Sequence, residues 1–173
     1  AAKLGLPGQG RLSGLQLKAN LGGEANAPLL IDLNIDQLAT PELPELAQGL
    51  HIHAEGSNQA HRWQGQANFP GKTRLTFAAE GGLFPEAGAQ AWRGRLLEVQ
   101  LSGEEKLRNF HLAAPAALKL GANGWIIGPA QLASKMLDWQ ATVQATADPQ
   151  HLYASLQGRG KRIGQVDGEL NAS

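Results

Sequence analysis

Residues 92–103 read Trp-Arg-Gly-Arg-Leu-Leu-Glu-Val-Gln-Leu-Ser-Gly, and residues 107–120 read Leu-Arg-Asn-Phe-His-Leu-Ala-Ala-Pro-Ala-Ala-Leu-Lys-Leu. In both stretches large apolar residues recur at every second position. From Leu97 to Leu101, for example, leucine and valine alternate with glutamate and glutamine. Successive side chains of a β-strand point to opposite faces of the sheet, so this period of two predicts strands with one apolar and one polar face.

The same alternation continues through most of the chain and predicts an all-β meander of about a dozen strands. We expect residues 1–173 to form a single β-rich unit, with residues 1–10 as a flexible lead-in. Because the chain begins with Ala1, we also expect it to be excised from a longer protein. The expected strands cover residues 15–21, 29–36, 50–55, 61–69, 75–79, 97–101, 110–114, 118–120, 125–127, 139–146, 152–157 and 163–172.

Three segments interrupt the alternation. Residues 40–49 begin with Thr-Pro, which suits the start of a helix, and we expect one short helical turn that ends at Gly49. Residues 81–90 contain a Gly-Gly pair, a proline and a further glycine, which predicts a long loop. Residues 131–137 fit either a strand or a poor helix, and the pattern does not decide between them.

The composition excludes several classes of function. Fifteen basic and fifteen acidic residues are well mixed and give a net charge of zero, so the electrostatic footprint of a nucleic-acid-binding protein is missing. The chain has no cysteine, which excludes disulfides and thiolate metal sites. No apolar run reaches the roughly 18 residues that a transmembrane helix needs.

The residues on the predicted apolar side are small or aliphatic, and only 5% of all residues are aromatic. We therefore expect a long, curved antiparallel sheet that curls into a taco-like trough with an apolar interior, and a closed β-sandwich is the alternative that the pattern leaves open. The residues expected to line the trough and contact acyl chains are Leu15, Leu17, Ile31, Leu33, Ile35, Leu50, Ile52, Leu75, Phe77, Leu97, Val99, Leu101, Leu112, Leu118, Leu120, Val143, Leu152 and Leu156.

No group of residues has the pattern of a catalytic or metal site. His51 and His53 share the polar side of one strand, and with His61 across a turn they come nearest to a set of metal ligands. No carboxylate cluster completes a ligand shell, so we expect solvated imidazoles. Glu104 and Glu105 follow a Ser-Gly pair in a predicted turn, where charge is common. The sequence therefore predicts neither an enzyme nor a bound metal or cofactor.

The four tryptophans, Trp63, Trp92, Trp125 and Trp139, each lie near the start or the middle of an expected strand. Two interpretations remain open. The indole rings line the rim of an apolar groove, with each N–H at a polar edge, or they close an ordinary protein core.

Residues 91–101 read Ala-Trp-Arg-Gly-Arg-Leu-Leu-Glu-Val-Gln-Leu, and residues 110–118 read Phe-His-Leu-Ala-Ala-Pro-Ala-Ala-Leu. This pair of elements resembles the TamB family of the translocation and assembly module. That family repeats Trp-x-Gly-x-Leu-x-x-Leu-x-Leu, followed by aromatic-x-Leu-x-x-Pro-Ala-x-Leu. Phe110 stands where the family often has tryptophan. Residues 43–56 also resemble the family, and the resemblance extends over residues 12–156.

The resemblance implies a periplasmic segment of a protein that is anchored in the inner membrane of a Gram-negative bacterium. Members of the family cross the periplasm as a long β structure with an apolar interior and engage an Omp85-class outer-membrane barrel. They are implicated in moving phospholipids between the membranes and in assembling outer-membrane proteins. For this chain the resemblance implies phospholipid acyl chains as the ligand, with the barrel and nascent outer-membrane proteins as partners of the parent protein.

Two other functions remain open at this stage. A scaffold or chaperone would use its edge strands to template nascent outer-membrane barrel proteins without conducting lipid. A compact β-sandwich would act as a generic binding module. The three functions differ in what covers the apolar residues, which the arrangement of the strands decides.

Overall fold

The computed structural model describes residues 3–5, 11–39, 46–86, 88–104, 109–122, 124–134, 138–148, 151–160 and 164–172. Within these ranges the chain forms strands and turns and no helix, so no helix there is long and apolar enough to cross a membrane. The all-β prediction is confirmed. Fourteen strands make one antiparallel sheet.

Most of the strands are long, and β7 and β8 reach 14 residues each. The strands are β1 (Lys3–Gly5), β2 (Arg11–Ser13), β3 (Gln16–Leu21), β4 (Pro28–Ala39), β5 (Ala47–Ser57), β6 (His61–Phe69), β7 (Thr73–Glu86), β8 (Ala89–Ser102), β9 (Phe110–Leu112), β10 (Ala116–Gly121), β11 (Gly124–Ser134), β12 (Trp139–Ala147), β13 (Leu152–Gly160) and β14 (Gly164–Ala172).

The strands follow one another across the sheet in chain order, apart from two shared positions. β2 and β3 both pair with β4, and β9 and β10 both lie between β8 and β11. Pro115 lies between β9 and β10, where it has no backbone N–H to donate to a neighbouring strand. The edges of the sheet are β1 and β3 at one end and β14 at the other.

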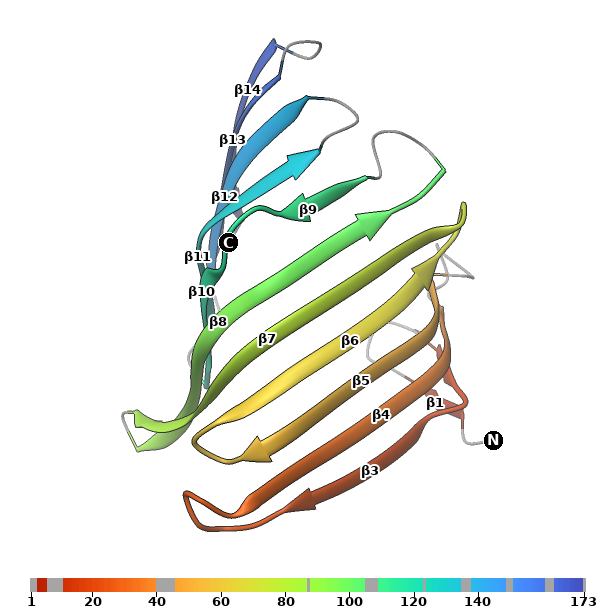
Figure 1. Cartoon of the computed structure of the whole chain (residues 1–173), viewed down its shortest axis with the longest axis vertical. Coiled ribbons are helices and arrows are strands. Elements are labelled where there is room, and N and C mark those ends of the chain that lie inside the picture. Colours follow the sequence, from red (N-terminus) through yellow and green to blue (C-terminus); the bar gives the residue numbers. More distant parts are fainter. Residues whose placement is uncertain are drawn as a thin grey trace.

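Figure 1 shows the long strands β4 to β8 side by side, with β10 to β14 turned relative to them. Neighbouring strands of a sheet are rotated by a right-handed twist, which accumulates across an open sheet and accounts for this turn. Among the described strands, β14 forms no hydrogen-bonded pair with β1 or β3. The two edges of the sheet therefore stay separate.

No second sheet is found among the described residues. All of the described strands belong to one hydrogen-bonded sheet. The chain exposes 11134 Å², whereas a compact monomer of 18.3 kDa exposes about 8,100 Å². The most buried side chains are small, such as Ala54, Ala91 and Ala116. The two packed sheets of the sandwich alternative are therefore absent from the described part of the chain.

The loop predicted for residues 81–90 is wrong, because β7 and β8 continue through this segment and meet in a tight turn. Gly81 and Gly94 are direct cross-strand partners. A Cβ atom at Gly81 would lie 2.4 Å from the carbonyl oxygen of Arg93 and 2.6 Å from Cζ2 of Trp92. These glycines thus mark a close approach inside a strand rather than a turn.

Three other boundaries differ from the prediction. β5 begins at Ala47, so the expected helical turn does not reach Gly49, and residues 40–45 lie outside the described ranges. Gly49 has a φ of 56° and lies at a register shift, which explains the break in alternation as a bulge. Lys3–Gly5 pairs with β2, so the lead-in is partly a strand. β11 extends through Ser134 as a strand, and the residues after it lie outside the described ranges.

Candidate binding surface on the apolar face

The cross-strand register gives the sheet one apolar face. Residues directly opposite each other in neighbouring strands point to the same face. One row of such partners crosses eleven strands and contains a single polar side chain: Leu21, Leu29, Gly56, His61, Gly81, Gly94, Leu118, Ile127, Ala145, Ala154 and Leu170. We call the face of this row the apolar face and the opposite one the polar face.

Most of the residues predicted to line a trough lie on the apolar face. Leu97 lies at a register shift in β8 and has no direct partner, and Leu15 precedes β3. The residues that the register places together on the apolar face are Leu17, Ile31, Leu33, Ile35, Leu50, Ile52, Leu75, Phe77, Val99, Leu101, Leu112, Leu118, Leu120, Val143, Leu152 and Leu156.

Burial on the apolar face is uneven, since Leu29 on β4 is 5% exposed whereas Leu120 on β10 is 45% exposed. Leu112 and Ala116 belong to a buried cluster against which Val99 packs. At the margins, Leu17 on β3 and Leu170 on β14 are 61% and 55% exposed. Within the described part of the chain, the face is therefore open to solvent at its two edge strands.

Aromatic rings on the apolar face pack over glycines of the neighbouring strands. All four tryptophans lie on this face. A Cβ atom at Gly65 would lie 2.2 Å from Cε1 of Phe77, and one at Gly158 would lie 3.1 Å from Nε1 of Trp139. Because glycine has no side chain, each ring can lie close to the backbone of the neighbouring strand, which keeps the face shallow.

Hydrogen bonds account for the one histidine in the apolar row. His61 and Trp92 are 5% and 7% exposed. The Trp92 indole N–H donates to Nε2 of His61 at 2.7 Å, so the imidazole proton lies on Nδ1 and is donated to the Ser57 carbonyl oxygen at 2.8 Å. Trp92 thus serves the fold, whereas Trp63, Trp125 and Trp139 are partly exposed. Sequence reasoning missed this pair because its members are 31 residues apart.

The three histidines of the candidate metal site do not come together. His51 and His53 lie beside Asp32 on the polar face, with ring nitrogens 3.4 Å and 3.5 Å from Asp32 Oδ2. His61 lies on the apolar face. The hydrogen bond from His51, together with those from Asn34 and His53, lowers the pKa of Asp32 below its ordinary value of 3.8. Among the described residues no group of metal-ligating side chains is found.

The carboxylates of Glu86 and Glu104 belong to ion pairs. Glu86 accepts a hydrogen bond from Lys119, and Arg93 lies 3.5 Å from it. The Lys119 hydrogen bond, aided by the charges of Lys119 and Arg93, lowers the pKa of Glu86 below its ordinary value of 4.5. Lys72 donates to Glu104 at 2.6 Å. The residue after Glu104 lies outside the described ranges.

The surface also contains shallow hollows on the polar face. One of about 430 Å³ lies over β11 to β14, and one of about 700 Å³ lies near Glu55, Arg62 and Arg95. Comparisons with protein-family models, with curated proteins and with solved structures find no match to this chain. The apolar face is thus the most extensive candidate surface, and its chemistry has to carry the functional argument.

Proposed function

We propose that this chain binds phospholipid acyl chains on the apolar face, as a segment of a longer protein that moves phospholipids between membranes. The main support is the row of apolar cross-strand partners that crosses eleven strands and exposes more than half of Leu21 and Leu170 at its two ends. A large exposed apolar surface on a protein normally marks a site of interaction with another molecule.

The chemistry of the apolar face suits a hydrocarbon chain. Its side chains are mainly leucine, isoleucine, valine and alanine, with rings that pack over glycines, and its polar residues Thr73 and Ser134 are buried. Each methylene group that leaves water for such a surface contributes about 0.8 kcal/mol. An acyl chain can therefore bind the apolar face at many positions of similar affinity. This favours movement of the acyl chain along the face over binding at one point.

The apolar face offers little to a lipid headgroup. His61 uses both ring nitrogens within the protein, one with Trp92 and one with Ser57. Selection among headgroups needs placed hydrogen-bonding groups. We therefore expect the chain to bind phospholipids by their acyl chains, with weak discrimination among headgroups.

The resemblance to the TamB family supports the same proposal. It adds a periplasmic location within an inner-membrane-anchored parent protein of a Gram-negative bacterium. It also adds an Omp85-class barrel as the partner of the parent protein and a contribution to outer-membrane biogenesis. These further statements depend on the resemblance alone, which is carried mainly by residues 91–101 and 110–118.

The edge strand β14 supports a second candidate function. It pairs with β13 along its whole length of nine residues, and no described strand pairs with its other side. An unpaired edge of this length can add a strand from another polypeptide. A scaffold for nascent outer-membrane proteins would use this edge instead of the apolar face.

Lipid extraction and native mass spectrometry of the chain purified from bacterial cells test the main proposal. We expect bound phospholipid in the wild-type chain and its loss in the Leu33→Asp, Leu101→Asp and Val143→Asp variants. Gln100→Asp and Gln144→Asp, which change neighbouring positions on the polar face, are the controls and should retain the lipid. Circular dichroism confirms the fold of each variant. A wild-type chain without phospholipid, or equal loss in the controls, would contradict the proposal.

A further inference from the structure

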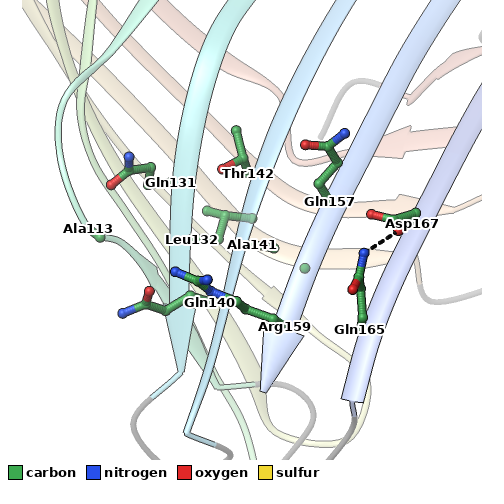
Figure 2. A pocket seen from close by; sticks show the side chains of 11 residues that line it. Ala113, Gln131, Leu132, Gln140, Ala141, Thr142, Gln157, Arg159, Gln165 and Asp167 are labelled. Carbon is green, nitrogen blue, oxygen red and sulfur yellow. Dashed lines mark hydrogen bonds between the residues drawn. The ribbon is translucent and has the colours of Figure 1, made fainter. Parts of the chain in front are cut away.

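The hollow over β11 to β14 lies on the polar face, away from the surface that we propose for acyl chains. Its volume is about 430 Å³, and it is lined mainly by amide, hydroxyl, guanidinium and carboxylate groups. Figure 2 shows these side chains on four consecutive strands. The register arranges them in two rows: Gln131, Thr142, Gln157 and Asp167 in one, and Gln140, Arg159 and Gln165 in the next.

Most of the polar side chains in this hollow have no side-chain partner among the described residues. In the part of the chain that the structure describes, only Gln165 and Asp167 are joined by a side-chain hydrogen bond, at 2.8 Å. Gln131, Gln157 and Arg159 make no side-chain hydrogen bond or ion pair there. Their donors and acceptors are therefore available to a ligand.

The centre of the polar face differs from this hollow. There Arg95 donates to Glu80, and Lys119 donates to Glu86, so these four charged groups have partners, whereas Arg62 and Glu98 make no ion pair among the described residues. The polar side of β12 carries no charge, since its residues are Gln140, Thr142, Gln144 and Thr146. Solubility alone is usually provided by mixed lysine and glutamate, so an uncharged amide and hydroxyl surface calls for another explanation.

The charge of the hollow limits what it can bind. Among the described residues that line it, Arg159 and Asp167 are the charged ones, and their formal charges cancel. A phosphate or another anion would meet one cation and one carboxylate, which is poor complementarity. An uncharged polar ligand has no such conflict.

We propose that this hollow binds an uncharged oligosaccharide. A glutamine amide both donates and accepts hydrogen bonds, and so does a sugar hydroxyl, so each pairing can be made in either direction. Neighbouring strands lie about 4.8 Å apart, and alternate residues of one strand about 6.6 Å apart, so the two rows form a grid of polar groups. Sugar rings carry hydroxyls around their whole rim and match such a grid, whereas a peptide presents its polar groups along one line.

The polar face extends this site along β13. Ser155 and Tyr153 follow Gln157 on the same side of the strand, and Tyr153 is paired with Thr146. Hydroxyl groups and one aromatic ring thus continue from the hollow toward the other end of the strand. A linear oligosaccharide would lie along this line, with the tyrosine ring offering a surface for stacking at its far end.

Titration of the isotope-labelled chain with cellohexaose and with chitohexaose, followed by NMR, tests this proposal. We expect saturable shifts of the side-chain amide signals of Gln131, Gln140 and Gln157 and of the backbone signals around them. Gln157→Ala and Arg159→Ala should each weaken binding by about tenfold, because each removes hydrogen bonds to the ligand. Both residues are exposed, and circular dichroism verifies that the variants fold.

Gln64→Ala is the matched control, since Gln64 is an exposed glutamine on the polar face of β6, outside the hollow. It should leave the affinity unchanged. Separate titrations with inorganic phosphate and with tetraglycine test the competing ligands. Absence of saturable shifts with both saccharides, equal effects of all three variants, or shifts of the hollow with phosphate or peptide alone would overturn the proposal. The outcome is independent of lipid binding, because the two sites lie on opposite faces.

Discussion

The centre and the margins of the sheet have the same alternation in sequence but not the same packing. In the centre, the glycines of β7 and β8 bring two backbones together under Trp92, whose N–H is bonded to a buried histidine. At the margins, every residue of β3 is exposed, and Leu17 and Leu170 expose more than half of their surface. Alternation therefore decides which face a side chain is on, whereas the side chains packed around it decide how deeply it is buried.

This difference separates structural from functional roles on the apolar face. Side chains at the centre stabilise the sheet, so replacing them should lower the free energy of unfolding. Side chains at the margins contribute little to stability and remain available to a ligand. Pairs of matched substitutions, one at the centre and one at the margin, test this division.

The largest difference is expected for glycine. Gly94→Ala places a Cβ atom 2.1 Å from the carbonyl oxygen of Glu80 and 2.6 Å from Cη2 of Trp92. Because a backbone atom has to move, we expect the free energy of unfolding to fall by about 2–4 kcal/mol. Gly168→Ala on β14 meets nothing within 4 Å and should be neutral or slightly stabilising. Urea denaturation of both variants makes the comparison, and equal losses would contradict it.

The second-largest difference in stability is expected between substitutions of Trp92 and Trp139. Trp92→Phe removes the N–H that donates to His61 and leaves a buried acceptor unpaired, at a cost of about 1–3 kcal/mol. Trp139→Phe also removes an indole N–H, but that group makes no hydrogen bond among the described residues. Its cost should stay below about 1 kcal/mol. Thermal unfolding measures both, and a larger loss at Trp139 would reverse the assignment of roles.

Aliphatic residues should follow the same order with smaller effects. Val99→Ser weakens the buried cluster around Leu112 and should cost about 1–2 kcal/mol. Leu17→Ser changes a side chain that is 61% exposed and should alter stability by less than about 0.5 kcal/mol. If lipid binding is measured alongside, Leu17→Ser should still reduce it, because stability and binding are separate at the margin.

The smallest effect on stability is expected for the loss of the Glu86 ion pair at acidic pH. The pKa of Glu86 is lowered in the folded state by Lys119 and Arg93, so this carboxylate adds stability above pH 4.5, and the contribution disappears as the pH falls through the lowered pKa. Wild type should therefore have a higher Tm than Glu86→Gln at pH 7, and the difference should vanish at strongly acidic pH. Glu169→Gln on the edge strand β14 is the control. A difference that grows on acidification would contradict this sign.

The sequence was sufficient to predict the fold class and the apolar face. The period of two survives in the structure because antiparallel neighbours preserve the face of each residue, so Leu33 and Leu101 lie where alternation put them. The loop predicted for residues 81–90 was wrong because glycine occurs both in turns and at close approaches between strands. Only the register shows that Gly81 faces Gly94 beneath a ring, a contact between distant parts of the chain.

The candidate site was only partly predictable for the same reason. Alternation identified the side chains of the apolar face. It did not decide whether a second sheet packs over them. The hydrogen bond between His61 and Trp92 and the grouping of Gln131 with Gln157 depend on how strands pair. No local pattern encodes pairings between strands, whereas turns and periodicity are local and can be read directly.

Photocrosslinking to phospholipid tests the central claim most directly. A photoreactive amino acid is placed at Leu33, Leu101 or Val143 on the apolar face, and at the adjacent Asn34, Gln100 or Gln144 on the polar face. Each pair differs by one residue along the strand and by the face of the sheet. We predict adducts with acyl-chain-labelled phospholipid at the three apolar positions and not at the three polar ones. Equal adducts on both faces, or adducts confined to the polar face, would contradict the assignment of lipid to the apolar face.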